Sequence, residues 1–274
     1  MTRLADALET VVRTDSGMVR SHNEDAVFAD AGMGLAILAD GMGGYNAGEV
    51  ASGMATTLLA ASLSQLVVES SLPAAEVLDP EFVEQRLLDE ISAVNVAIFN
   101  ASESQSQYAG MGTTLVVAYF YDNRMSVAHL GDSRLYRLRH GHLEQLTRDH
   151  SLLQEQLDSG IISPDEARYF QNKNLLTRAL GVDPFVETEI HDYGMQPGDV
   201  VLLCSDGLND MLDDEDVAQT LLAAGGDLTL AADQLVRMAN DNGGRDNISV
   251  ILVKVRGDYS TPRGWWQKLL ARFL

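Results

Sequence analysis

The strongest constraint on the fold is a run of strand-like segments in the middle of the chain, with no room for helices between them. The segments are Thr113–Tyr121, Met125–Leu130 and Leu135–Arg139. The pairs Asp122-Asn123 and His140-Gly141, which are typical of tight hairpin turns, follow the first and the last segment. Strands joined this closely pair antiparallel, because a parallel connection needs about a dozen residues or more. The sequence therefore predicts antiparallel sheets.

The remaining segments predict how these sheets are covered. Further strand-like segments are Thr10–Thr14, Ala26–Ala29, Leu35–Ala39, Val186–Ile190, Val200–Ser205 and Ile248–Val255. Helix-like segments form two pairs, one made of Ala47–Val68 and a helix that begins at Asp79-Pro80, the other of Asp214–Ala224 and Leu228–Asn240. The order predicts an α/β (α+β) layered sandwich, in which helix pairs flank two packed antiparallel β-sheets. It does not fit a doubly wound parallel sheet.

The chain predicts one domain, residues 1–257, with an insertion and a tail. The pattern breaks up over residues 151–184, where Ser163-Pro164-Asp165-Glu166 resembles a capping box on a short helix. This insertion carries Arg168, Lys173 and Arg178 in a chain poor in basic residues. It is either a long connector or a functional surface segment.

Bulk composition excludes several classes of function. The 274 residues are 46% hydrophobic, which is enough for a sizeable core. Acidic residues outnumber basic ones by 40 to 19, so the net charge of −21 opposes binding to nucleic acid but not to divalent cations. The single cysteine, Cys204, excludes an internal disulfide framework. With no signal sequence and no long apolar run, we expect a cytoplasmic protein.

Four aspartates stand where strand-like segments meet glycine-containing turns. They are Asp40 before Gly41, Asp132 after Gly131, Asp206 before Gly207, and Asp246 after Gly243-Gly244, while Glu24 and Asp25 precede another strand. A single aspartate of this kind would be a turn former, but several carboxylates at one edge repel each other unless cations neutralise them. Oxygen ligands favour Mg²⁺ or Mn²⁺, whereas the lack of cysteines and the scatter of the six histidines argue against zinc.

Other phosphate chemistries and hydrolytic motifs do not fit. A cysteine-dependent phosphatase needs an arginine six positions after its nucleophile, and the residue there after Cys204 is Asp210. The chain has no G-x-x-x-x-G-K-[ST] phosphate loop and no G-x-S-x-G elbow. We therefore expect the glycines of Gly41–Gly44 to let the backbone after Asp40 come close to a metal ion, so that the Gly41 carbonyl can also be a ligand.

Seven short motifs occur in a fixed order within residues 10–255. They are R-x-x-N-E-D (Arg20–Asp25), A-D-G-M-G-G (Ala39–Gly44), G-T-T (Gly112–Thr114), L-G-D-S-R (Leu130–Arg134), T-R-D-H-S (Thr147–Ser151), S-D-G-L (Ser205–Leu208) and R-D-N (Arg245–Asn247). Together they resemble the metal-dependent PPM-type (type 2C) serine/threonine protein phosphatases in their bacterial form. The resemblance implies a double β-sandwich flanked by helix pairs, in agreement with the pattern of segments.

The resemblance also implies a pair of Mn²⁺ or Mg²⁺ ions at the centre of the site. Asp40 would bridge the two ions, Asp206 and Asp246 would bind the first, and the Gly41 carbonyl would bind the second. Two ions about 3.5–4 Å apart lower the pKa of a bridging water, and the resulting hydroxide attacks phosphorus in line. Protein phosphoserine or phosphothreonine would be hydrolysed without a phosphoenzyme.

Further residues take roles around this pair by the same resemblance. Glu24 and Asp25 would hold the waters of the second ion or coordinate it. Asp132, with Asp206, would form a third and weaker metal site. Arg20 would grip the substrate phosphate with its planar fork of donors. The partners implied are phosphorylated proteins, among them a serine/threonine kinase and its substrates.

The source of the leaving-group proton is left open. Some eukaryotic members carry a histidine where this chain has Met42, and neither His22 nor His150 is a clear replacement. Asn247 would contact the ligand residues rather than an ion. Two other interpretations remain open, a PPM-like domain that only binds or senses and a phosphomonoesterase for small metabolites.

The C-terminal tail, residues 258–274, has the pattern of an amphipathic helix. Trp265 and Trp266 begin it, and basic residues separate its later apolar positions. Within residues 263–274 the segment is too short to span a bilayer. It either docks on the domain or a partner, or lies as a weak interfacial anchor at a membrane surface.

Overall fold

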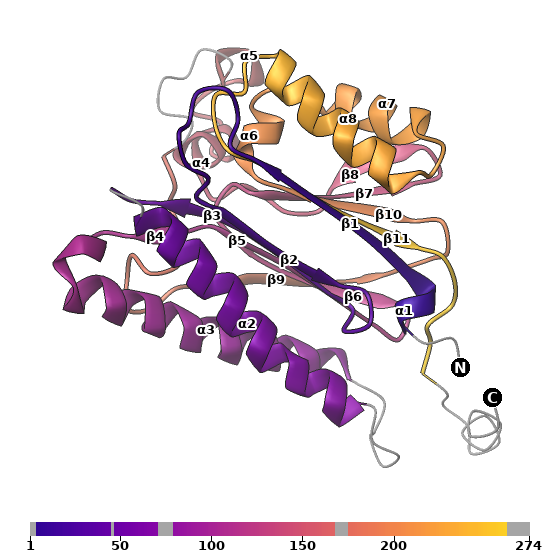
Figure 1. Ribbon diagram of the computed structural model, residues 1–274, viewed down its shortest axis with the longest axis horizontal. Helices are drawn as coiled ribbons and strands as arrows, with labels where there is room; N and C mark the ends of the chain where they lie inside the picture. The colour runs from indigo at the N-terminus through magenta and orange to yellow at the C-terminus, as the bar shows by residue number, and fades with distance from the viewer. Residues whose placement is uncertain (1–3, 45–46, 71–78, 168–174, 262–274) are drawn as a thin grey trace.

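Two antiparallel β-sheets form the centre of the computed structural model, which describes residues 4–44, 47–70, 79–167 and 175–261 (Figure 1). The first sheet has the order β1 (Leu8–Asp15), β11 (Ile248–Val255), β10 (Val200–Cys204), β7 (Arg134–Arg139) and β8 (His142–Gln145). The second has the order β2 (Asp25–Asp30), β3 (Leu35–Met42), β5 (Leu115–Tyr121), β6 (Arg124–Leu130) and β9 (Glu189–Gly194), with β4 (Gly112–Thr113) paired to the end of β3. The predicted fold class is confirmed.

A helix pair covers the outer face of each sheet (Figure 1). The second sheet carries α2 (Ala47–Ser70) and α3 (Pro80–Ser104), and the first carries α7 (Asp214–Ala223) and α8 (Leu228–Asp241). Shorter elements are α1 (Leu4–Ala7), a 3₁₀ turn at Ser106–Tyr108, α4 (Leu152–Asp158), α5 (Pro164–Ala167) and α6 (Asp206–Asn209). Helix α3 begins as predicted, because the side chain of Asp79 accepts a hydrogen bond from the Glu81 amide at 3.1 Å.

The two predicted hairpin turns have the backbone that their residues favour. Asp122 and Asn123 have φ angles of 43° and 56°, and His140 and Gly141 have 50° and 82°. Positive φ at both central residues is the condition for a two-residue type I′ turn, which matches the twist of the flanking strands. These turns connect β5 to β6 and β7 to β8, and they set the register of both pairs.

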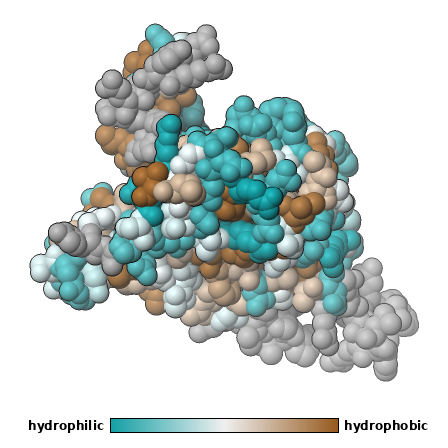
Figure 2. Space-filling view, turned by 45° about the horizontal axis from the view of Figure 1, so that its top comes forward, coloured by the Kyte–Doolittle hydropathy of each residue, from teal (hydrophilic) through white to brown (hydrophobic). Residues whose placement is uncertain are grey.

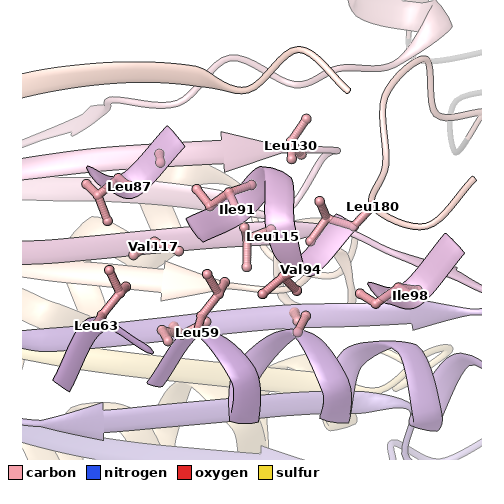
Figure 3. Close-up of a cluster of buried hydrophobic side chains, with 14 of the residues drawn as sticks. Leu59, Leu63, Leu87, Ile91, Val94, Ile98, Leu115, Val117, Leu130 and Leu180 are labelled. Atoms are coloured by element: carbon pink, nitrogen blue, oxygen red, sulfur yellow. The ribbon is translucent and has the colours of Figure 1, made fainter. Parts of the chain in front are cut away.

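The core has three apolar layers because successive side chains of a strand point to opposite faces. All of β5 is buried, and it feeds two layers at once. Leu115 and Val117 pack against α2 and α3, beside Leu59 and Ile91, as the close-up shows (Figure 3). Alternate residues such as Val116 face the opposite sheet. A third layer lies between the first sheet and α7 and α8.

Among the elements that depart from the predicted pattern are a displaced strand, a short edge strand and a one-turn helix. The strand predicted at Val186–Ile190 lies further along the chain, at Glu189–Gly194, where its polar side chains reflect its place at a sheet edge. The short edge strand β8 and the one-turn helix α6 were not predicted, because neither has an apolar periodicity of its own. The Ser151 and Leu176 backbones form a β-bridge at the base of the insertion.

The insertion contains the predicted capping box. The Ser163 amide donates to Glu166 Oε2 at 2.8 Å, and the Glu166 amide donates to Ser163 Oγ at 3.4 Å, at the start of α5. The predicted tail helix at residues 263–274, like Arg168 and Lys173, lies outside the described residues. In the described part of the chain, no helix combines the length and apolar character needed to cross a bilayer.

Hydrophilic residues cover much of the face shown in the space-filling view, and hydrophobic residues lie there in scattered patches (Figure 2). This distribution agrees with a chain in which 22% of the residues are charged.

Replacing Ile91 by alanine should lower the free energy of unfolding by about 2–5 kcal/mol, because a buried side chain between α3 and the second sheet is lost. Urea denaturation measures the change. Val96→Ala is the matched control on the same helix, since Val96 is 42% exposed and its loss should cost at most about 0.5 kcal/mol. Equal costs for the two variants would contradict this account of the core.

Candidate metal centre

The predicted aspartates converge at one end of the sandwich, and both sheets contribute to the group. Asp25 and Asp40 are cross-strand partners at the same end of β2 and β3. Asp206 lies two residues after the end of β10, as the first residue of α6, and Asp246 lies two residues before β11, which is the antiparallel neighbour of β10. Asp132 lies in the connection between β6 of one sheet and β7 of the other. Figure 1 shows this end where β4 pairs with the end of β3, with α6 above them in the view.

Glycine is required at two positions at this end of the sandwich, because the backbone of another segment passes very close to each of them. A Cβ atom on Gly41 would lie 2.1 Å from the Gly48 carbonyl oxygen and 2.6 Å from that of Glu24. A Cβ atom on Gly207 would lie 2.0 Å from the Asn247 carbonyl oxygen. These approaches bring the loop before β2, the start of α2 and the loop before β11 against the ends of β3 and β10.

Burial and mutual repulsion raise the pKa values of these carboxyl groups. For Asp40, burial and then Asp25, Asp206, Asp132 and Asp246 raise the pKa well above its usual range. For Asp206, burial and then Asp132 and Asp246 have the same effect on the pKa. Burial is also the main cause that raises the pKa of Asp25 to about 6 and that of Asp132 to about 7. Without cations, the group therefore holds protons at a pH where ordinary aspartates have lost them.

Two carboxylate oxygens of the group also lack a hydrogen-bond partner. Asp25 Oδ1 and Asp206 Oδ1 are both buried and unpaired. Burying a polar atom without a partner is costly, and acceptor-only carboxylate oxygens can be satisfied here only by a donor or a cation. An all-oxygen donor set with unpaired, mutually repelling acids fits Mg²⁺ or Mn²⁺.

Arg20 brings a positive charge to the rim of the group. Its Nη2 atom donates to Asp246 Oδ2 at 2.6 Å, while its side chain is 54% exposed. An exposed guanidinium can exchange this carboxylate for a phosphate, which its planar fork also matches. Glu24 lies nearby, and burial raises its pKa, with Arg20 opposing the shift.

Asn247 ties the loop that carries Arg20 and Glu24 to the first sheet. Its Oδ1 atom accepts a hydrogen bond from the Glu24 amide at 2.8 Å. Its Nδ2 atom donates to the carbonyl oxygens of Ser16 and His22 at 3.1 and 2.8 Å. The buried amide therefore uses its acceptor and both donors to hold residues 16–24 against the start of β11.

Sequence reasoning missed the hydroxyl groups that position the aspartates. Thr114 Oγ1 accepts from the Asp40 amide at 3.0 Å and lies 2.7 Å from Ser133 Oγ. Ser205 Oγ donates to Asp25 Oδ2 at 2.8 Å. The sequence does contain a signal for these hydroxyl groups, because each of the motifs G-T-T, G-D-S-R and S-D-G-L includes a serine or threonine.

Of the residues considered for the leaving-group proton, Met42 carries no titratable group and His150 is engaged by hydrogen bonds. Met42 ends β3 paired with Gly112, and His150 uses both ring nitrogens, with the Gly131 amide at 3.3 Å and Glu189 Oε2 at 3.1 Å. Beside it, Asp149 forms a two-pronged ion pair with Arg134. The T-R-D-H-S motif therefore supports the loop that carries Asp132, and the charge of Asp149 adds to the effect of burial in raising the pKa of that aspartate.

Comparison with known proteins places the chain in a family. Residues 18–249 match the family model described as protein phosphatase 2C. The serine/threonine phosphatase stp of Listeria welshimeri is 41% identical over 245 residues, which are 88% of this chain and 94% of that protein. The serine/threonine protein phosphatase PstP of Mycobacterium tuberculosis is 38% identical over 255 residues, which are 93% of this chain and 46% of that protein.

Solved structures agree. A crystal structure of the M. tuberculosis phosphatase PstP/Ppp superposes with a TM-score of 0.80 at 37% identity and covers 91% of this chain and 99% of that one. A structure of the PstP catalytic domain in complex with two manganese ions gives a TM-score of 0.78 at 37% identity, again over 91% and 99% of the two chains. The chain belongs to the metal-dependent protein phosphatase 2C (PPM) family.

Proposed function

We propose that this protein hydrolyses phosphoserine and phosphothreonine in proteins, with residues 1–257 as its catalytic domain. The observation that carries the proposal is the convergence of five aspartates from both sheets, two of them with unpaired buried oxygens, beside an exposed arginine. Family membership supports the reaction class. The role of each residue as a metal ligand or substrate contact is part of the same proposal.

The convergence of the carboxyl groups supports one ligand set. Asp40, Asp206 and Asp246 would hold a pair of Mn²⁺ or Mg²⁺ ions with the Gly41 carbonyl, assisted by Glu24 and Asp25; Asp132 would help to hold a third ion. When bound, the ions supply an activated water and neutralise charge on the substrate phosphate.

The chain's own residues orient the substrate. A cation that neutralises Asp246 would weaken its attraction for Arg20 and release the guanidinium toward the phosphate. Asn247 would keep that arginine's loop in place, through its bond to the Glu24 amide. Phosphate recognition would thereby depend on prior filling of the carboxylate group.

The insertion at residues 151–184 is proposed to border the site and to contact protein substrates. Its two ends attach next to ligand residues. The His150 amide donates to the Gly131 carbonyl at 2.8 Å, directly before Asp132. The backbones of Leu180 and Thr113 form two hydrogen bonds at 2.9 and 3.1 Å, and Thr113 is the cross-strand partner of Gly41.

Exposed apolar residues of the insertion suit a peptide better than a small ester. Ile161 and Leu175 are 72% and 52% exposed. The expected substrates are phosphorylated proteins, among them a serine/threonine kinase and its targets; the tail at residues 263–274 would add a weak contact with a partner or a membrane surface. A phosphomonoesterase for small metabolites would not need these apolar groups.

Asp40→Asn and Asp206→Asn should each lower Mn²⁺-dependent hydrolysis of a phosphothreonine peptide by at least about a hundredfold, because each removes a charged ligand. The assay follows phosphate release with and without chelator, and circular dichroism checks folding. Asp241→Asn, an exposed residue at the end of α8, is the control and should retain activity. Full activity in either ligand variant would refute the assignment.

The stability gained from Mn²⁺ should grow as pH rises from 5.5 to 7.5. Without metal, the raised pKa values of Asp25 and Asp132 mean that the folded state binds more protons than the unfolded chain above about pH 4. Stability of the metal-free protein therefore falls as pH rises toward 7. Bound ions remove this loss, so the difference in Tm between loaded and chelator-treated protein should increase by at least about 4 °C.

Differential scanning calorimetry at the two pH values measures this difference in Tm. The double variant Asp25→Asn, Asp132→Asn should show a smaller change with pH, because two of the titrating carboxyl groups are gone and their repulsion of Asp40 and Asp206 is lost. An unchanged pH dependence in that variant, or none in the original chain, would contradict the electrostatic account.

Replacing Ile161 and Leu175 together by serine should raise KM for phosphopeptides several-fold and leave p-nitrophenyl phosphate hydrolysis unchanged. The reason is that the insertion would lose its apolar contacts with peptide while the aspartate group stays intact. Leu230→Ser, at a 50% exposed position on α8, is the matched control. Equal effects on both substrates would argue against a role of the insertion in substrate selection.

A further inference from the structure

Three of the chain's six histidines meet around one glutamate, apart from the aspartate group. His129 lies on β6, and Glu189 is its cross-strand partner on β9. His191 follows on β9, and His150 comes from the segment between β8 and α4. Strand register therefore assembles residues that are far apart in the sequence.

Glu189 is hydrogen-bonded on both of its carboxylate oxygens. Oε2 lies 3.1 Å from His150 Nε2, and Oε1 lies 2.8 Å from His191 Nε2. Although burial opposes it, the bonds from His191 and His150 lower the pKa of Glu189 to about 2. The glutamate is therefore an anion that faces two imidazole rings.

His129 has a buried ring nitrogen without a partner. Its Nε2 atom lies 2.9 Å from the Arg148 carbonyl oxygen and 3.3 Å from the Arg148 amide nitrogen, and the shorter contact, with the carbonyl oxygen, favours a proton on Nε2. Nδ1 is then a bare acceptor, and it is buried and unpaired in a side chain that is 1% exposed. Burial lowers the pKa of His129 to about 4, so the ring is neutral, which is the form that binds metals.

We propose that His129, His150 and Glu189 form a second kind of metal site, which takes Zn²⁺ or a similar transition-metal ion. One ligand atom from each of the three lies within 4.8 Å of the others. In a tetrahedral zinc site with bonds of about 2.0–2.2 Å, ligand atoms are about 3.4 Å apart. The 3.1 Å between His150 Nε2 and Glu189 Oε2 is already close to that spacing.

Binding shifts the proton of one imidazole to its other nitrogen and turns that ring. The His150 and His129 rings are stacked, with centroids 4.7 Å apart and planes at 11°, so their in-plane lone pairs cannot both point at one ion. The ion would take the place of the proton between His150 Nε2 and Glu189, and the imidazole stays neutral because the proton moves to Nδ1, which then no longer accepts from the Gly131 amide. His150 then rotates toward Nδ1 of His129. Glu189 is 30% exposed, which gives the ion a route from solvent.

The donor set separates this site from the aspartate group. Imidazole nitrogens favour zinc and related ions, whereas carboxylate and carbonyl oxygens favour Mg²⁺ and Mn²⁺. Among the described residues, these three form the one set of His, Cys, Asp or Glu side chains whose ligand atoms converge so closely. His191 would hold the free oxygen of Glu189 and orient the carboxylate.

The test is Zn²⁺ binding by the full chain in saturating Mg²⁺, which occupies the oxygen sites. A chromogenic chelator competes for Zn²⁺, and Co²⁺ substitution reports a tetrahedral nitrogen-containing site by its visible absorption. We expect one equivalent of Zn²⁺ to bind under these conditions. Glu189→Gln should weaken its affinity at least about tenfold, and His191→Ala, at an exposed position, should weaken it less.

Glu187→Gln is the matched control, because it makes the same chemical change two residues away at an exposed position. It should bind Zn²⁺ like the original chain, and so should Asp206→Asn. The proposal fails if no Zn²⁺ binds in the presence of Mg²⁺, or if both glutamine variants bind alike. It also fails if Asp206→Asn alone abolishes binding, because Zn²⁺ then occupies the aspartate group. Failure of the proposed phosphatase activity would appear separately, as an inactive original chain.

Discussion

Mutual repulsion among buried aspartates is the constraint on which the rest of the structure depends. Burial raises the pKa of Asp40, and the charges of four other carboxyl groups raise it further. Neither sheet could hold such a group alone, since Asp25 and Asp40 come from one sheet, and Asp206 and Asp246 lie just beyond the strand ends of the other. The apolar layer between the sheets therefore does more than stabilise the fold, because it fixes the two halves of a charged group against each other.

The same constraint explains why so many hydrogen bonds surround the aspartates on their protein side. Asn247 uses all of its amide groups to hold the loop at residues 16–24, and Thr114 and Ser205 bond to the backbone or side chain of an aspartate. Each bond limits how far the carboxyl groups can move apart. Bonds of this kind hold the strand ends and loops that carry the carboxyl groups in place before a cation binds.

Sequence reasoning succeeded where the signal is local. Hairpin turns, the α3 cap and the strand-end aspartates are each encoded within a few neighbouring residues, so their places were predicted. The edge strands β8 and β9 were missed or displaced, because an edge strand has little apolar alternation. Contacts such as Ser205 with Asp25 join residues far apart in the chain, and no local pattern encodes them. The roles of the aspartates as ligands remain predictions.

The histidines show the limit of reasoning from spacing most clearly. Their scatter along the chain argues against zinc only if distance in sequence measures distance in space, and the pairing of β6 with β9 breaks that link. His129 and Asp132 are only three residues apart in the sequence. His129 belongs to the site with imidazole donors, and Asp132 belongs to the aspartate group. His150 joins them, since its ring contacts Glu189 and its backbone bonds to Gly131. An ion that turned the His150 ring would break its bond to the Gly131 amide, directly before Asp132. The proposed site at His129, His150 and Glu189 is therefore placed to influence the aspartate group through the loop between β6 and β7.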